Sequence, residues 1–225
     1  MRVAVALALL IFAAAHAAAQ GADRRVPVDP NEAPWDAIAK VQSNIGAHCT
    51  GVLIAPLVVL TAAHCLYNAR TRALLQPVSL HVLFGYQRGQ YRWHRLVVHI
   101  TVGPGFDGAR GAAQPADWAR LDLAEAVPVT PLPLFAGSAN PGMAVALAGY
   151  NQDRAQLLMA DLGCHVLKIV RLPGDARFLT HDCAATRGTS GAALLTRQDS
   201  GWAVIAVNIA AGRAENLALA APFGN

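Results

Sequence analysis

Three residues in this sequence have the types and local settings that nucleophilic catalysis requires. His64 lies in TAAHC, directly after an apolar run; Asp117 opens the segment DWARLDL; and Ser190 lies in the turn GTSG. A serine hydroxyl is a weak nucleophile and needs a base to accept its proton, which a neutral imidazole can do near pH 7. A buried carboxylate fixes the tautomer of that imidazole. The trio therefore predicts a Ser-His-Asp arrangement.

The glycines around Ser190 predict a tight, exposed backbone turn. Gly188 would let its own backbone N–H and that of Ser190 point at a developing oxyanion. One such donor stabilises a transition state by about 3 kcal/mol. We therefore expect Gly188 and Ser190 to form an oxyanion hole. The alternative is an ordinary turn that happens to contain a serine.

Each catalytic assignment has a structural rival. A lone histidine is commonly a core residue, so the catalytic assignment of His64 depends on its partners further along the chain. For the carboxylate, Asp107 lies in a glycine loop, and Asp122 lacks the alternating apolar pattern that follows Asp117. That alternation predicts a strand with Asp117 at its entrance, which favours Asp117 over the other two.

The chain has four cysteines, and four cysteines allow three disulfide pairings. Cys49 and Cys65 flank one hairpin-like stretch, which favours Cys49–Cys65 together with Cys164–Cys183. Several histidines adjoin these cysteines, which raises a zinc site as an alternative. Of the usual zinc spacings, however, C-x2-4-C is missing, and the only H-x3-5-H pair, His94 and His99, has no cysteine near it. We expect two disulfides, no metal and no cofactor.

The first nineteen residues predict a secretory signal peptide. Met1-Arg2 is basic, the following run to Ala15 is apolar, and Ala17-Ala18-Ala19 offers a small-residue cleavage site. The run is shorter than the ~20 apolar residues that a membrane span needs, so we expect no membrane anchor. Residues 20–33 are polar and predict a mobile leader. An exported chain with disulfides is expected to be secreted or periplasmic.

Composition predicts an ordered globular protein. Charged residues make up only 14% of the chain, and the formal net charge is +4. The densest basic group, at 88–95, is most simply a solvated strand face, because nucleic-acid binding would need a denser basic stripe with interleaved aromatics. We expect a monomer that acts on protein or peptide substrates and binds no nucleic acid.

The remainder of the chain predicts an all-β fold. Short runs rich in valine, isoleucine and leucine recur between glycine and proline turns, and long amphipathic helical stretches are missing. Helical turns are expected only near 62–67 and 151–156. The proline-rich stretch 128–135 predicts a stiff, extended linker between a β unit at 34–127 and a second at 136–225.

Taken together, TAAHC, DWARL and GTSGAAL resemble the three catalytic blocks of chymotrypsin-fold serine peptidases, in that family's order. The resemblance runs from about Pro34 to the C-terminus, and PWDAIAKV at 34–41 resembles the first strand of the bacterial glutamyl-endopeptidase-like branch. It implies a serine endopeptidase with two six-stranded antiparallel barrels, with His64 and Asp117 on the first barrel and Ser190 on the second. It also implies the Cys49–Cys65 bridge beside the histidine.

The sequence departs from that family's pattern in two places. Thr189 stands where most trypsin-like members have the aspartate that pairs with a new N-terminus, so we expect no insertion of that kind and no buried carboxylate to serve it. "ADRRV" offers a trimming site after Arg25. In the specificity pocket, Ala184 provides no charge, and Asn208 and Asn216 predict a mildly polar pocket that favours a small or neutral P1 residue. The alternative function is a catalytically weak binding or adhesion protein on the same scaffold.

Overall fold

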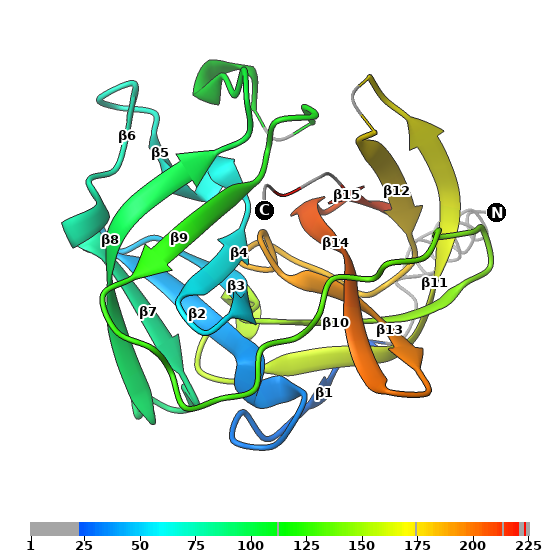
Figure 1. The fold of residues 1–225 in the computed structure, drawn as a ribbon, viewed down its shortest axis with the longest axis horizontal. Coiled ribbons are helices and arrows are strands. Elements are labelled where there is room, and N and C mark those ends of the chain that lie inside the picture. Colours follow the sequence, from blue (N-terminus) through cyan, green and yellow to red (C-terminus); the bar gives the residue numbers. More distant parts are fainter. Residues whose placement is uncertain (1–22, 112, 174, 213, 221–222, 224–225) are drawn as a thin grey trace, which may run out of the picture.

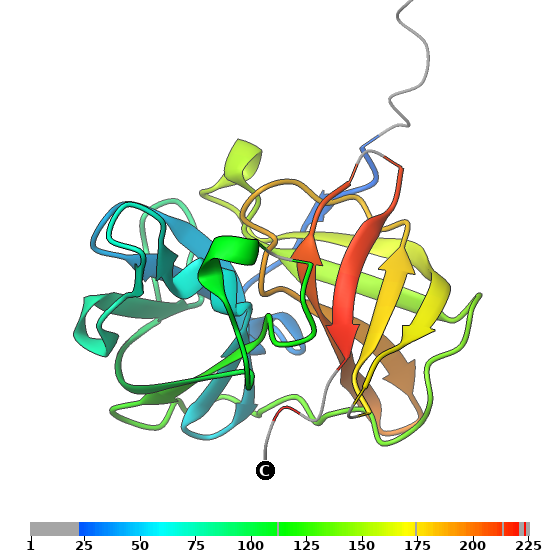
Figure 2. The same ribbon diagram turned by 90° about the horizontal axis from the view of Figure 1, so that it is seen from above.

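The short apolar runs fold into two antiparallel barrels that lie side by side (Figures 1 and 2). The computed structural model describes residues 23–220 and 223, apart from residues 112, 174 and 213. The predicted signal peptide at 1–19 lies outside these described residues. The expected all-β fold of two six-stranded barrels is confirmed. In the described ranges, no helix has both the length and the apolar character needed to cross a membrane.

The first barrel closes in the strand order β2-β3-β4-β9-β8-β7. In β9, with the sequence ARLDL, buried residues alternate with more exposed ones, because successive side chains point to opposite faces of a sheet. Fully buried side chains such as Ile38, Leu53 and Leu121 fill the interior of the barrel. The strands are β2 (Ile38–Ser43), β3 (His48–Ala55), β4 (Val58–Thr61), β7 (Leu80–Phe84), β8 (Trp93–Val102) and β9 (Ala119–Leu123).

The second barrel runs β11-β10-β13-β14-β15-β12 and closes where β12 pairs with β11. Its strands are β10 (Ala144–Gly149), β11 (Met159–Arg171), β12 (Arg177–His181), β13 (Ala193–Gln198), β14 (Gly201–Ala210) and β15 (Asn216–Ala220). The sequence did not predict β12, because RFLTH has no apolar run and buries only Leu179 and His181. Its pairing with β11 and β15, rather than its own composition, fixes it as a strand.

The remaining elements are short. The expected helical turns are present as η2 and η5. One hairpin, formed by two strands of two residues each, extends from the first barrel. These elements are the 3₁₀ turns η1 (Trp35–Ala37), η2 (Ala63–Leu66), η3 (Pro77–Ser79), η4 (Gly108–Arg110) and η5 (Gln152–Arg154), and the strands β5 (Tyr67–Asn68) and β6 (Ala73–Leu74).

The described part of the leader, from residue 23 onward, differs from the mobile segment that its polar composition predicts. Strand β1 (Val26–Pro27) pairs with β11 at the edge of the second barrel. The Val28 N–H continues the contact by donating to the Leu158 carbonyl at 3.1 Å. Proline is tolerated there because an edge strand has one side without partners. Two residues of the leader therefore form the seventh strand of that sheet.

The stretch 128–135 connects the barrels as an extended chain and contacts both of them. Leu132 N–H donates to the Leu53 carbonyl of the first barrel at 2.9 Å. Phe135 N–H donates to the Val204 carbonyl of the second barrel, and Val204 N–H donates to Pro133, both at 2.8 Å. These bonds fix the connector against each barrel, and so help to fix the barrels relative to each other.

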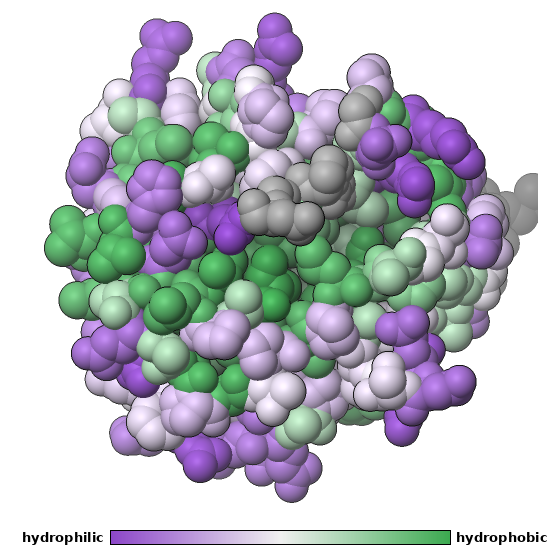
Figure 3. Space-filling view, viewed as in Figure 1, coloured by the Kyte–Doolittle hydropathy of each residue, from purple (hydrophilic) through white to green (hydrophobic). Residues whose placement is uncertain are grey.

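A continuous apolar core spans the junction between the barrels. Tyr86 and Tyr150 meet edge to face with ring centroids 5.7 Å apart, and the Tyr150 hydroxyl donates to the Tyr86 carbonyl at 3.0 Å. On the face viewed in Figure 1, apolar surface gathers in the middle and hydrophilic residues lie mainly at the periphery (Figure 3). Groups contributed by different barrels are thus held on a rigid frame.

Candidate active site

His64 lies in the 3₁₀ turn η2, which begins two residues after β4 ends. The turn is fixed from both sides: Ala63 and Leu66 are buried, and the next residue, Cys65, forms a disulfide with Cys49 of β3. The His64 side chain keeps 24% of its surface exposed. The imidazole therefore stands on a crosslinked strand end with one part reachable from solvent.

Asp117 lies at the end of the loop before β9, and its side chain is completely buried. The Asp117 N–H donates to the Gln114 carbonyl at 3.1 Å. The Gln114 side chain in turn braces the loop, accepting from the Asp107 N–H and donating to the Asp107 and Gly111 carbonyls. This bracing holds the Asp117 carboxylate in place before the strand begins.

The two side chains meet directly. Asp117 Oδ2 lies 2.8 Å from His64 Nδ1, and Asp117 Oδ1 accepts the backbone N–H of His64 at 2.8 Å. An ionised carboxylate can only accept, so Nδ1 carries the proton and Nε2 is left as the basic nitrogen. This is the orientation that a general base of this kind requires.

Ser190 occupies a turn whose shape depends on its glycines. Gly188 has φ +92° and Gly191 has φ +80°, values that side-chain-bearing residues rarely adopt. The turn is closed by Ala192 N–H donating to the Thr189 carbonyl at 3.0 Å. It leaves Ser190 half-buried at the tip, ahead of β13.

The serine turn from the second barrel packs against the first barrel. Thr50 N–H donates to the Ser190 carbonyl at 2.9 Å, and Thr50 Oγ1 donates to the Gly188 carbonyl at 2.9 Å. A Cβ on Gly191 would lie 2.1 Å from the Thr50 carbonyl oxygen and 2.2 Å from Thr61 Oγ1. Only glycine permits this approach, which brings Ser190 to the strand end that carries His64.

Two backbone donors in this turn are free for a ligand. Among the described residues, neither the Gly188 N–H nor the Ser190 N–H donates a hydrogen bond within the protein. The intervening Thr189 N–H is instead used, donating to the Thr186 carbonyl at 3.2 Å. This pattern of two free donors around one occupied donor fits the expected oxyanion hole.

The Ser190 hydroxyl is not hydrogen-bonded to His64 in the described structure. The structure thus joins His64 to Asp117 and brings Ser190 to the same junction without closing the last contact. Catalytic hydrogen bonds are often long or poorly aligned before substrate binds and tighten in the reacting complex.

The rivals of these residues lie elsewhere. Asp107 caps η4 and pairs with Arg110, and Asp122 lies within β9. In the part of the chain that the structure describes, the one close group of three metal-ligating side chains is Cys49, His64 and Cys65. Both of its sulfurs are joined in a disulfide, so it offers no thiolate, and it does not fit a zinc site.

The predicted pocket residues are held by internal bonds. Asn208 is buried; its amide donates to the Thr189 carbonyl at 3.1 Å, and its Oδ1 lies 3.0 Å from His181 Nε2. The Asn216 amide donates to the Cys183 carbonyl, and its Oδ1 accepts from the Gly212 N–H. Ala184 is half-buried. The polar groups of both asparagines are therefore already paired inside the protein.

Two further residues join this network that sequence reasoning missed. His181 is fully buried behind Asn208, and burial lowers its pKa from 6.5 to about 4, so it is neutral near pH 7. The carboxylate of Asp161 is only 1% exposed. It overturns the expectation that no buried carboxylate is available near the serine segment. Neither residue stands in a recognisable motif. Their burial depends on the pairing of their strands, which the sequence did not reveal.

The Cys164–Cys183 disulfide ties β11 to the segment that precedes Ser190. Together with Cys49–Cys65, it accounts for all four cysteines. Each barrel thus has one crosslink that ends within a few residues of the site.

Comparison with known proteins agrees with this architecture. The family model of the trypsin-like peptidase domain matches residues 49–207, which is more than half of the chain, so the chain belongs to that family. The fold resembles a solved structure described as "Structure of Glu endopeptidase in complex with MPD", with a TM-score of 0.74 and 21% identity over 89% of this chain and 92% of that chain. No curated protein sequence matches the chain. The expectation of a serine-type endopeptidase is confirmed at the level of the family.

Proposed function

We propose that this protein is an exported endopeptidase that hydrolyses peptide bonds through a triad of Ser190, His64 and Asp117. The observation that carries the proposal is the pair of hydrogen bonds by which Asp117 fixes His64 beside the glycine turn of Ser190. A purely structural histidine would not need a fully buried carboxylate aligned on its Nδ1.

In the first half-reaction, Ser190 Oγ attacks the scissile carbonyl carbon while His64 Nε2 takes the hydroxyl proton. The oxyanion that forms is stabilised by the Gly188 and Ser190 N–H groups, which have no hydrogen-bond partner among the described residues. The C–N bond then breaks, and His64 returns the proton to the leaving amine. This leaves an acyl-enzyme, an ester on Ser190.

In the second half-reaction, water replaces the amine. His64 takes a proton from water, the resulting hydroxide attacks the ester carbonyl, and the second oxyanion uses the same two N–H donors. Collapse of that intermediate breaks the C–O bond to Ser190 Oγ, which recovers its proton from His64. Asp117 remains ionised throughout and stabilises the transient imidazolium. This chemistry uses side chains and backbone alone.

For specificity, we propose a preference for small or neutral P1 residues. An acidic P1 side chain needs a cationic or donating group in the pocket, and a basic one needs a carboxylate. Ala184 supplies neither. The amide of Asn208, at the position where glutamyl-specific members carry histidine, is already hydrogen-bonded to Thr189 and His181. Leaving a charged P1 side chain without a partner in such a pocket is costly.

The second candidate function is a binding protein on the same scaffold with little turnover. The absence of a Ser190–His64 hydrogen bond among the described residues favours it. Export is proposed for either function, because two disulfides are typical of proteins in oxidising compartments.

Fluorophosphonate labelling separates the two candidates. We expect the oxidised protein to be labelled at Ser190 and to cut a mixed peptide library, and we expect Ser190→Ala to do neither. The cut sites then give the P1 preference directly. If the folded wild type is not labelled and cuts no peptide, the peptidase assignment fails and the binding function takes its place.

A further inference from the structure

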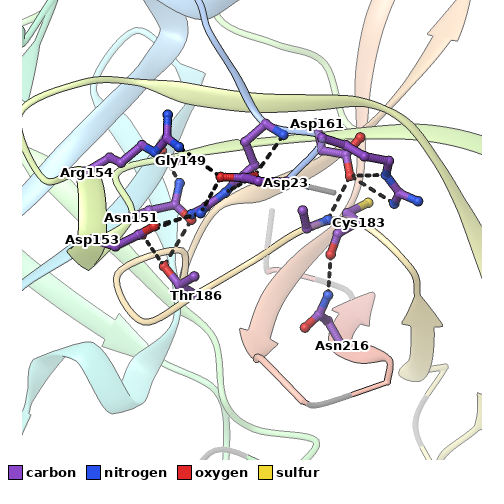
Figure 4. A network of polar contacts seen from close by, with 12 residues as sticks. Asp23, Gly149, Asn151, Asp153, Arg154, Asp161, Cys183, Thr186 and Asn216 are labelled. Carbon is purple, nitrogen blue, oxygen red and sulfur yellow. Dashed lines mark hydrogen bonds and ion pairs between the residues drawn. The ribbon is translucent and has the colours of Figure 1, made fainter. Parts of the chain in front are cut away.

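The beginning of the described chain, residues 23–27, forms a strap along the edge of the second barrel, where β1 pairs with β11. Figure 4 shows the polar contacts around it, with Asp23, Asp153 and Asp161 labelled. Within the strap, Arg24 reaches the buried carboxylate of Asp161. Its Nε and one terminal nitrogen donate to Asp161 Oδ2 at 3.1 and 3.0 Å, and it also donates to the Asp182 carbonyl. A carboxylate that is 1% exposed requires a cation or several donors, and the strap supplies the cation.

The neighbouring Arg25 makes a second, separate ion pair. Its two terminal nitrogens donate to the two oxygens of Asp153 at 3.0 and 2.7 Å, and its Nε donates to Asp23 at 2.8 Å. The Arg25 side chain is only 8% exposed. A two-pronged contact of this kind fixes orientation as well as charge. A cut after Arg25 in the folded protein would have to pull this side chain out of its pairs.

Both carboxylates also hold the segment 182–188 that precedes the serine turn. Asp161 Oδ2, the oxygen that binds Arg24, accepts the Ala184 N–H at 2.7 Å. Asp153 Oδ1, which binds Arg25, accepts the Thr186 hydroxyl at 2.8 Å. Arg25 is therefore one carboxylate away from this segment, whereas Arg24 reaches it both through Asp161 and directly at the Asp182 carbonyl.

The connection continues to the oxyanion donors. The Thr186 carbonyl accepts the Thr189 hydroxyl at 2.6 Å and the Thr189 N–H at 3.2 Å. The Arg187 carbonyl accepts the Gln152 N–H at 2.6 Å, from η5, whose Asp153 pairs with the strap. The peptide units on either side of Gly188 are thus set by contacts that lead back to the strap.

We propose that Arg24 and Arg25 are positioning residues for the oxyanion hole and the Ser190 turn. This inference rests on the proposed peptidase function. Trypsin-like relatives use a new N-terminal amine beside the serine, whereas here two arginine side chains act from a strap already paired with β11. Removing Arg24 would leave the Asp161 carboxylate buried without its cation, so the carboxylate would move toward water and release Ala184. Removing Arg25 would free Asp153 and loosen Thr186.

The test uses the full oxidised chain with the substitutions Arg24→Met, Arg25→Met, Arg24→Lys and Arg25→Lys. Methionine keeps an unbranched apolar side chain in place of the aliphatic part of arginine and removes the charge; lysine restores the charge without the fork. The control is Arg197→Met, which removes an exposed arginine on β13, away from the strap. Two quantities are measured: the rate of fluorophosphonate labelling with kcat and KM for one peptide ester, and hydrogen exchange of amides 182–190.

We expect the methionine variants to fold, to exchange amides 182–190 faster than wild type, and to lose kcat and labelling rate by about 10- to 100-fold at little-changed KM. We expect the lysine variants to recover part of that loss and Arg197→Met to behave as wild type. If a methionine variant is too unstable to fold, the matching lysine variant, with charge but no fork, carries the comparison.

Two results would overturn the proposal. One is unchanged exchange at 182–190 in the methionine variants, which would show that the strap does not hold the segment. The other is faster exchange with wild-type labelling and kcat, which would show that holding the segment does not matter to the serine. A wild type that is never labelled refutes the peptidase function instead, while the exchange measurement still decides whether the strap holds the segment.

Discussion

Asp117 accepts two hydrogen bonds from a single residue, His64: one from its backbone N–H and one at its imidazole Nδ1, both at 2.8 Å. The backbone bond fixes the position of the carboxylate relative to the turn, and the side-chain bond fixes the ring relative to the carboxylate. Because Asp117 is fully buried, the pair has a single arrangement. In the mechanism we propose, the base is therefore oriented before any substrate arrives.

The substitution Asp117→Asn tests this arrangement. The amide would donate toward Nδ1 and favour the wrong tautomer, so kcat should fall by about 10⁴-fold, the size of loss known for triads of this kind. The rate of ester hydrolysis at pH 7 measures the loss in kcat, and circular dichroism checks that the variant is folded. A loss of less than tenfold in a folded variant would contradict the role given to Asp117.

The substitution Gly188→Ala tests the turn. A Cβ there would lie 2.3 Å from the Tyr150 carbonyl oxygen, and the residue has φ +92°, so the backbone must shift. We expect kcat to fall by about 100-fold or more because an oxyanion donor is displaced. Gly142→Ala is the matched control: it has φ +82° with open space around it, so it carries backbone strain without the clash. Equal activity losses in both variants would be evidence against a specific role of Gly188.

Stability should fall as the pH drops from about 6.5 to about 4, through His181. Burial lowers the pKa of this histidine from 6.5 to about 4 in the folded protein, so between these values the unfolded chain binds more protons and folding weakens. The gap corresponds to about 3 kcal/mol in the free energy of unfolding. Urea unfolding at pH 4 to 7 measures it. His181→Gln keeps an N–H donor without titrating, so its pH dependence should be flatter; a wild-type slope would contradict the assignment.

Acid should weaken the strap at lower pH still. The hydrogen bonds from Arg25 lower the pKa of Asp153 from 3.8 to about 2, so this ion pair contributes stability that is complete above pH 4 and is lost as the pH falls toward 2. The Asp153 side chain is 45% exposed, so added salt should reduce the contribution. Arg25→Met should be less stable than wild type at pH 6, with the difference shrinking toward pH 2. A difference independent of pH would mean that the pair contributes only packing.

Much of the fold could be predicted from the sequence because most of its strands have an apolar composition that is recognisable over a few residues. Runs such as MAVALAG at 143–149 combine β-branched or aliphatic residues with glycine boundaries, and they are strands here. The strand β12 was missed because Arg177–His181 owes its conformation to two neighbours far along the chain. The described leader was misread because its polar composition hides its pairing with β11.

The site shows the same division. His64, Asp117 and Ser190 stand in short motifs, and the structure brings their turns to one junction. The network behind them was not predictable, because Asp161 and Arg24 are 137 residues apart and neither stands in a motif. Whether two distant polar residues pair depends on which strands become neighbours and which of their side chains point inward. A single sequence gives no local signal for either.

The two disulfides place a chemical condition on the timing of activity. One joins Cys49 to Cys65, the residue next to His64. The other joins Cys164 to Cys183, in the segment that leads to Ser190. Neither bond is expected to persist in a reducing cytoplasm. A newly made chain would therefore lack the braces on both halves of its site. With the export that we propose, oxidation outside the cytoplasm would supply both braces together, so we expect the chain to gain activity only after it has left the proteins of its own cytoplasm.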